Sequence, residues 1–116
     1  DAAEADGLGI GTVYPVTKRA GGVFADRIGL GRARSVDVCV FLGKVSKYHA
    51  YITKTEDGFE ITDAGSKNGT KVAGKKLVPK QAAKLVNGAD IEVGPYHFTF
   101  YTAAGFLEVV ESWLRT

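Results

Sequence analysis

The sequence predicts an all-β fold, a β-sandwich of about nine to eleven short strands with a short amphipathic helix at its C-terminal end. Short runs of β-branched and aromatic residues are separated by turn signals roughly every eight to twelve residues, which is typical of sandwiches. No long helical pattern alternates with these runs, which argues against a parallel α/β sheet. The length of 116 residues and the 45% hydrophobic content fit one domain with one core.

The N-terminal half divides into a leader and a series of extended patterns. Residues 1–12 are rich in Ala, Asp and Gly without periodicity, so we expect a flexible leader or linker there, followed by the sandwich over residues 13–101. The first expected strand contains Pro15, which cannot donate to a ladder and therefore favours an edge position. The expected strands of this half are Val13–Thr17, Val23–Leu30, Val38–Leu42, His49–Lys54 and Phe59–Asp63, and Asp57-Gly58 marks a hairpin before the last of them.

The second half begins with the polar loop Gly65–Thr70, whose glycines allow a tight turn. The run Val72–Leu77 has Ala-Gly at its centre and predicts a hairpin. Residues 79–86 are expected to connect it to the final pair of strands, Asp90–Val93 and Tyr96–Tyr101, which a Gly-Pro turn separates.

The tail has a different period. Apolar residues recur at helical spacing, and they are Phe106, Leu107, Val109, Val110, Trp113 and Leu114. The pattern predicts a helix over residues 105–115. A helix this short is marginal in isolation, so we expect it to pack on the domain or on a neighbouring one.

The charge is unevenly distributed. The chain carries +2 overall, yet the span from Arg32 to Lys84 holds eleven Lys and Arg against five Asp and Glu, a net of +6. Such asymmetry favours an anionic partner for that span. We interpret Lys75, Lys76 and Lys80 as solvated lysines on strands and hairpin tips.

The single cysteine, Cys39, excludes an internal disulfide and a cysteine-based zinc site, and its apolar run predicts a buried core residue. No apolar stretch reaches the length of a membrane span and no signal segment opens the chain, so we expect a cytoplasmic protein with no membrane partner. The lack of an initiating Met suggests a piece of a longer protein.

Three loops carry the chemistry of interest: Gly31-Arg32, Ser46–His49 and Gly65–Thr70. If their strand ends lie at one edge of the sandwich, an Arg fork, a Ser hydroxyl and Lys ammonium groups form a phosphate receptor. Its candidate residues are Arg32, Ser46, Lys47, Lys67 and Asn68, and the amide of the last suits the main chain of an extended peptide.

The spacing of these motifs resembles the forkhead-associated (FHA) domain. Gly31-Arg32 is followed by Ser46-x-x-His49 and then by Ser66-x-Asn68-Gly69-Thr70. The flanks match as well, with Asp37 before an apolar strand, Asp63 before the central loop and a late Asn-Gly-Ala-Asp-Ile turn. The resemblance covers roughly Val13 to Tyr101 and implies an eleven-stranded sandwich whose apical loops bind phosphothreonine peptides.

The resemblance also assigns roles to residues. Arg32 would contact the phosphate, Ser46 would hydrogen-bond it and Lys47 would add a phosphate or backbone contact. Asn68 would bind the peptide main chain after the phosphothreonine. Three further residues would be structural, with the glycines shaping the loops and the histidine bonding one loop to another; they are Gly31, Gly69 and His49.

Two positions depart from the pattern. The family often has Thr or Ser where this chain has Lys67, which keeps affinity for anions but lacks the short hydroxyl contact. The position before His49 is often Arg and is Tyr48 here. Lys44 is a candidate specificity residue that would read an acidic side chain in the peptide, or else it is simply solvent-exposed.

These observations predict a phosphothreonine-peptide reader of bacterial type in Ser/Thr-kinase signalling, whose partner is a kinase or a kinase substrate. The alternative is an FHA-like interaction domain that binds independently of phosphorylation. An enzyme is not expected, because the two histidines lie in separate strands and no nucleophile, paired carboxylate or metal motif accompanies them. No cofactor is expected, and nucleic-acid binding through a basic edge near Tyr48 and Tyr51 is the weaker interpretation.

Overall fold

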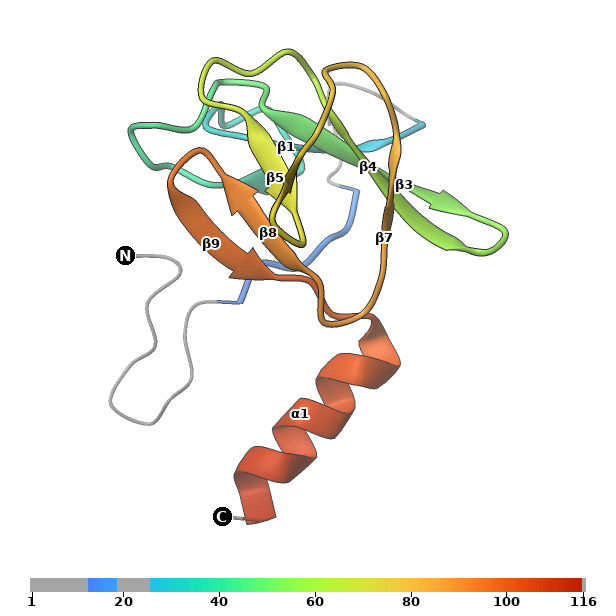
Figure 1. The fold of residues 1–116 in the computed structure, drawn as a ribbon. Coiled ribbons are helices and arrows are strands. Elements are labelled where there is room, and N and C mark those ends of the chain that lie inside the picture. The colour runs from blue at the N-terminus through green and yellow to red at the C-terminus, as the bar shows by residue number, and fades with distance from the viewer. Residues whose placement is uncertain (1–12, 19–25, 116) are drawn as a thin grey trace.

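The computed structural model describes residues 13–18 and 26–115, which form two β-sheets followed by one helix (Figure 1). One sheet has the strand order β2-β1-β3-β4-β7 and the other β6-β5-β8-β9. The strands of the first sheet are β1 (Ile28–Gly31), β2 (Val38–Cys39), β3 (Ala50–Thr55), β4 (Gly58–Asp63) and β7 (Ala83–Leu85). Those of the second are β5 (Thr70–Val72), β6 (Lys75–Lys76), β8 (Asp90–Val93) and β9 (Tyr96–Thr99), and the helix is α1 (Ala103–Arg115). The predicted sandwich with a C-terminal helix is confirmed.

Alternation of apolar and polar residues sets which face of each strand is buried. In β8, Ile91 and Val93 point inward with 5% and 0% exposure, while Asp90 and Glu92 face outward. In the facing sheet, Ile52 of β3 is directly opposite Ile61 of β4, and both side chains are as buried as those of Ile91 and Val93. Full burial of one such side chain stabilises the fold by about 1.5–3 kcal/mol, so this alternation fixes the register.

The described residues form nine strands, which is the lower end of the predicted nine to eleven and not the eleven that the resemblance implies. Val13–Thr17 is not a strand: Pro15 lacks an N–H group, and the segment is attached by side chains instead. Tyr14 and Val16 pack against the core, and the Tyr14 ring meets the Phe98 ring edge-on at 6.0 Å. The strand expected from Val23 begins at Ile28 within the described residues, and the expected leader over residues 1–12 lies outside them.

Three local expectations were wrong. The run Val38–Leu42 is a strand only to Cys39, because the Leu42 N–H donates to the Val40 carbonyl in a tight turn. Cys39 is half-buried instead of a core residue. The segment expected to be a plain connection, residues 79–86, contains β7, which pairs with β4.

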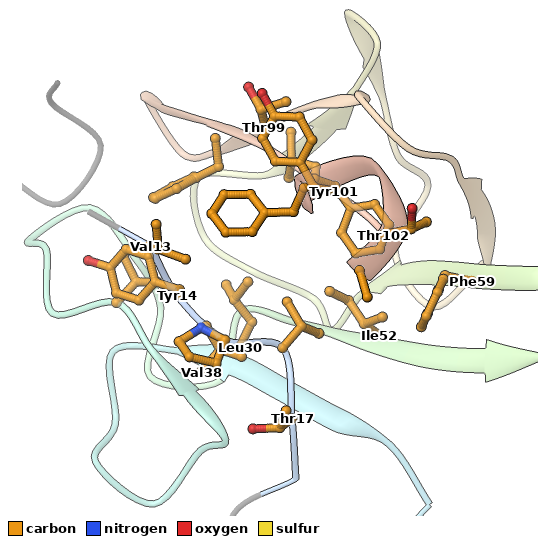
Figure 2. A pocket seen from close by; sticks show the side chains of 18 of the residues that line it. Val13, Tyr14, Thr17, Leu30, Val38, Ile52, Phe59, Thr99, Tyr101 and Thr102 are labelled. Atoms are coloured by element: carbon orange, nitrogen blue, oxygen red, sulfur yellow. The ribbon is translucent and has the colours of Figure 1, made fainter. Parts of the chain in front are cut away.

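A cavity of about 700 Å³ opens between the segment of residues 13–17, the inner faces of both sheets and α1, which lines it with Ala103, Phe106 and Trp113 (Figure 2). In the figure Val13 and Tyr14 lie on one side of it, and Ile52 and Phe59 on the other. Most of its lining is apolar, so it belongs to the hydrophobic interior of the domain at the end where α1 begins.

The helix starts at Ala103, two residues before the expected boundary, because Thr102 caps it. The Gly105 N–H donates to Thr102 Oγ1 at 3.1 Å, and the Thr102 N–H in turn donates to Asn87 Oδ1 at 2.9 Å. Farther along, α1 leads away from the sandwich, and Leu114 is 81% exposed (Figure 1). Packing of this helix on the domain or on a neighbour stays a prediction. Among the described residues, no helix has the length and apolar character to cross a membrane.

Thr102→Ala should destabilise α1, since it removes the hydroxyl that satisfies the Gly105 N–H. We expect a loss of about 1 kcal/mol in the free energy of unfolding and reduced helical signal in circular dichroism. Thr102→Ser keeps the hydroxyl and is the control. Equal helicity in Thr102→Ala and the wild type would contradict this account of the helix start.

Candidate functional site

The three loops singled out from the sequence lie together at the end of the sandwich away from α1 (Figure 1). They are residues 32–37 after β1, residues 40–49 between β2 and β3, and residues 64–69 between β4 and β5. The β8–β9 turn joins them, because the Gly94 N–H donates to the Gly69 carbonyl at 3.0 Å. The strand order thus brings together loops that are distant in sequence.

Asp63, at the end of β4, fixes the loop of residues 64–69. Its Oδ2 accepts from the N–H groups of Gly65 at 2.9 Å and Ser66 at 3.0 Å. Its Oδ1 accepts from the hydroxyls of Ser66 at 2.5 Å and Thr70 at 2.7 Å. Ser66 Oγ also accepts from the Gly69 N–H at 3.0 Å, so one carboxylate organises the whole turn.

The electrostatics of Asp63 follow from these contacts. The side chain is 2% exposed, and burial alone would raise its pKa. The hydrogen bonds from Ser66, Thr70 and the Gly65 N–H favour the charged form more strongly, and the pKa is lower than its ordinary value. The carboxylate therefore remains ionised and holds the loop at neutral pH.

His49 connects two of the loops from inside the protein. It is fully buried, and its Nδ1 accepts from the Ser46 N–H at 3.0 Å. Nδ1 therefore carries no proton, which leaves Nε2–H to donate to the Gly69 carbonyl at 2.8 Å. Both ring nitrogens are engaged with main-chain groups, so this imidazole is not free to act as a general base.

Burial lowers the pKa of His49, and the hydrogen bond to Gly69 and the charge of Asp63 oppose that shift without overcoming it. The folded state thus favours the neutral ring. This agrees with the hydrogen-bond pattern, in which one nitrogen must accept.

The loop after β1 is attached to the loop between β2 and β3 at two points. The Arg32 N–H donates to the Ser46 carbonyl at 2.9 Å, and Arg32 Nε donates to the Val45 carbonyl at 3.0 Å. A Cβ on Gly31 would collide with the main chain of Lys47, so glycine is required there. No described residue accepts from the two terminal nitrogens of Arg32, and these remain available to an anion.

Two side chains link the second loop to the third. Ser46 Oγ accepts from the Lys67 N–H at 3.0 Å, which leaves its own hydroxyl proton to donate elsewhere. Asn68 Nδ2 donates to the Lys44 carbonyl at 2.8 Å, which orients the amide and leaves its oxygen available. Ser46 and Asn68 therefore both support the loops and present polar atoms at the surface.

Lysines surround the rim that the three loops, residues 32–37, 40–49 and 64–69, form at this end of the sandwich. Lys44, Lys47 and Lys67 are exposed on the loops. Two lysines that the sequence suggested were merely solvated also lie beside the central loop: a Cβ placed on Gly69 would be 3.3 Å from Lys76 Cε, and one on Gly65 would be 3.8 Å from Lys80 Cε. All five ammonium groups add positive potential at one end of the molecule.

The structure therefore brings together every residue that the sequence nominated for binding. An Arg fork, a Ser hydroxyl and several ammonium groups converge on one rim, and they suit an oxyanion with several acceptor oxygens. The central position of Asp63 was not predicted, although an Asp at the start of a turn, here Asp63-Ala64-Gly65-Ser66, is a recognisable signal for hydrogen bonds from the main chain to the side chain.

The family model described as "FHA domain" matches residues 28–94. The chain belongs to the FHA domain family. This confirms the resemblance of the loop motifs, and the match includes the binding residues nominated above.

Curated relatives of this FHA domain are bacterial. The oxoglutarate dehydrogenase inhibitor of Corynebacterium jeikeium is 35% identical over 82% of this chain and 68% of its own length. The glycogen accumulation regulator GarA of Mycobacterium tuberculosis is 33% identical over 84% of this chain and 62% of its own length. The chain thus spans about two thirds of the relatives it matches.

Solved FHA structures share the fold. The second FHA domain of a Mycobacterium tuberculosis ABC transporter superposes with a TM-score of 0.57 at 28% identity, covering 77% of this chain and 80% of that one. Mycobacterium tuberculosis EmbR, solved in complex with a low-affinity phosphopeptide, gives a TM-score of 0.60 at 26% identity, covering 84% of this chain and 26% of that one.

Gly31→Ala should disrupt the FHA loops, because the added methyl meets main-chain atoms of Lys47 that cannot move independently. We expect a loss of about 1–3 kcal/mol or more in the free energy of unfolding, measured by denaturant titration. Gly43→Ala is the matched control, since no atom lies near a Cβ at that position. Equal stability of the two variants would show that the close approach at Gly31 is unimportant.

Stability should decrease as the pH falls below about 6.5, the ordinary pKa of histidine, because the unfolded chain then binds a proton that buried His49 resists. The stabilisation is complete above that pH and is lost as the pH falls toward the lower folded pKa, with a slope of at most about 1.4 kcal/mol per pH unit. Thermal melts at several pH values measure it.

His49→Gln should flatten this decline between about pH 6.5 and 5, even though the variant is less stable throughout. His97→Gln removes the exposed histidine instead and should keep the decline. A wild-type slope retained in His49→Gln would assign the pH dependence to other groups.

Proposed function

We propose that this FHA domain binds phosphothreonine-containing segments of partner proteins, acting in Ser/Thr-kinase signalling or phosphorylation-dependent assembly. The observation that carries the proposal is the convergence of Arg32, Ser46 and Lys67 through direct inter-loop hydrogen bonds. A phosphothreonine carries close to two negative charges at neutral pH and three strong acceptor oxygens, which this rim matches in charge and in donor number.

Each residue has a distinct role in this proposal. The terminal nitrogens of Arg32 donate to phosphate oxygens. Their position is fixed because Arg32 Nε donates a hydrogen bond to the Val45 carbonyl. The Ser46 hydroxyl gives a short hydrogen bond, while Lys47 and Lys67 contribute point charges. Asn68 uses its amide on the peptide main chain next to the phosphothreonine.

The structural residues act by holding these groups in place. Gly31 allows the first loop to approach the second, and Gly69 adopts a φ of 82° that favours glycine. Buried His49 links the loop of residues 40–49 to the loop of residues 64–69 through its hydrogen bonds with Ser46 and Gly69. Lys44 lies beside Asn68 and is the candidate to select an acidic residue in the peptide.

Selectivity for phosphothreonine over phosphoserine depends on one methyl group. Burying it is worth only about 0.8 kcal/mol by the methylene estimate, so a larger preference requires a pocket that also fixes the rotamer. We expect a modest preference from burial alone.

The partners that fit this proposal are a Ser/Thr kinase or a substrate of one, in the cytoplasm. Relatives named as an enzyme inhibitor and as a regulator suit a binding module that acts by docking and does no chemistry itself. For nucleic acid, the rings of Tyr48 and Tyr51 are less suitable, since they stack on each other at 6.3 Å and Arg27 covers the second ring.

Arg32→Ala should weaken binding of an oriented phosphothreonine peptide library by about 10- to 100-fold, because charge-assisted hydrogen bonds contribute about 1.5–3 kcal/mol each. Lys54→Ala removes the same charge from an exposed position on β3, outside the three loops, and should bind like the wild type. Binding is measured against the unphosphorylated library.

Each outcome has a clear meaning. A wild type without preference for the phosphorylated library would contradict phosphothreonine recognition and favour the alternative, an interaction domain that works without phosphorylation. Phosphate-dependent binding that survives Arg32→Ala unchanged would instead reject the assignment of the site.

A further inference from the structure

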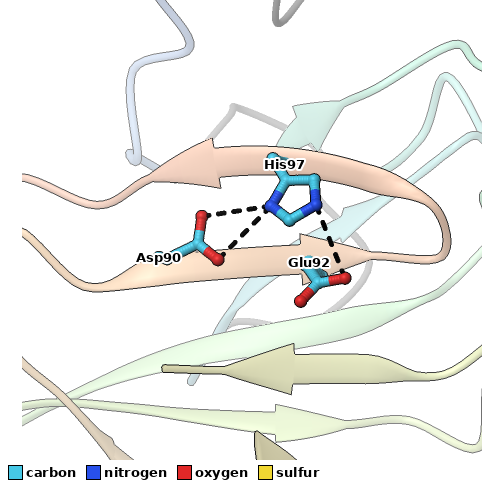
Figure 3. A group of neighbouring side chains, drawn as sticks. All are labelled: Asp90, Glu92 and His97. Carbon is cyan, nitrogen blue, oxygen red and sulfur yellow. Dashed lines mark hydrogen bonds and ion pairs between the residues drawn. The ribbon is translucent and has the colours of Figure 1, made fainter. Parts of the chain in front are cut away.

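The outer face of the β8–β9 hairpin carries a cluster of side chains that the phosphopeptide site does not use. Glu92 is paired directly with His97, and Asp90 lies two residues earlier on the same strand, diagonal to that histidine. Alternate residues of a strand share a face, and facing residues in an antiparallel pair have Cβ atoms about 4.5–5.5 Å apart. All three side chains therefore project together from the sheet (Figure 3).

Their ligand atoms are close. His97 Nδ1 lies 3.4 Å and 3.3 Å from the two carboxylate oxygens of Asp90, and Nε2 lies 3.6 Å from Glu92 Oε1. One ligand atom from each residue can be chosen so that all three lie within 4.8 Å of one another. Because Nδ1 faces Asp90 and Nε2 faces Glu92, a single metal ion uses only one of the two ring nitrogens. Metal–ligand bonds of about 2.0–2.2 Å place ligand atoms roughly 3.5 Å apart, so binding requires the imidazole to turn and the two carboxylates to move toward it.

Within residues 13–18 and 26–115, no lysine or arginine lies within ion-pair distance of either carboxylate, although Lys71 of β5 is opposite Glu92 in the sheet. The ionic contacts of Asp90 and Glu92 are those with His97. Two carboxylates held this near each other repel. The facing imidazole, when unprotonated, adds a neutral nitrogen that can coordinate a metal ion. A divalent cation relieves the repulsion.

We propose that Asp90, Glu92 and His97 form a binding site for a first-row divalent metal ion, with Zn²⁺ as the representative ligand. One imidazole and two carboxylates suit Zn²⁺, Co²⁺ or Mn²⁺, whereas a site for Mg²⁺ or Ca²⁺ would have oxygen ligands alone. Three protein ligands leave at least one position open to water or to a donor from another molecule. The Glu92 side chain is only 19% exposed, whereas Asp90 and His97 are open to solvent, so a metal ion can reach the site from solution.

The test is calorimetric titration of Zn²⁺ into the whole chain, purified without a histidine tag and stripped with a chelator. We expect one ion per chain in the wild type and a loss of at least about tenfold in affinity in both Glu92→Gln and His97→Ala, since even outer residues of metal sites contribute that much. Glu56→Gln, the same change in charge on the exposed β3–β4 turn, is the matched control and should bind like the wild type.

Nuclear magnetic resonance of the imidazole groups identifies the ligand independently of affinity, because the chain has only two histidines. Zn²⁺ should shift the ring signals of His97 and leave those of buried His49 in place. Binding that is unaffected by Glu92→Gln and His97→Ala, or no binding to the wild type, would overturn the proposal. Neither result bears on phosphopeptide binding, which uses other residues.

Discussion

The buried carboxylate of Asp63 is the interaction on which the candidate site depends. Four donors meet it, two from the main chain and two from hydroxyls, and they convert a glycine-rich segment into one defined turn. A buried carboxylate without such donors would be strongly destabilising, so the turn and the charge require each other. Because Gly69 ends this turn, its carbonyl is placed where His49 can reach it.

From that point the contacts run outward to the surface. His49 fixes the Ser46 main chain, Ser46 accepts from Lys67, and Arg32 bonds to the same stretch. The groups proposed to bind phosphate are thus positioned before any ligand arrives, which reduces the ordering cost of binding. The opposite end of the sandwich, with α1 and the cavity, contributes to none of these contacts.

Much of this arrangement could be predicted from the sequence, and the failures have physical causes. Turn residues and two-residue alternation located most strands, and the spacing of Gly31-Arg32, Ser46 and Asn68 located the three loops of the candidate site. The strand β7 (Ala83–Leu85) could not be predicted, because its pairing with β4 comes from tertiary contacts and not from its own pattern. Val13–Thr17 has strand composition, but Pro15 removes a donor and side-chain packing alone attaches it. Lys76 and Lys80 add positive charge to the rim because the loop of residues 64–69 folds beside them. The residues around these lysines in the sequence do not predict that contact.

The most direct test of the central claim is a titration of the ¹⁵N-labelled domain with a phosphothreonine peptide, followed by amide chemical shifts. A preformed phosphate receptor predicts the largest shifts at residues 31–33, 44–47 and 66–69, small shifts in the β3–β4 turn and in α1, and none of these changes with the unphosphorylated peptide. Shifts centred on α1 or a sheet face, or equal shifts with both peptides, would contradict it.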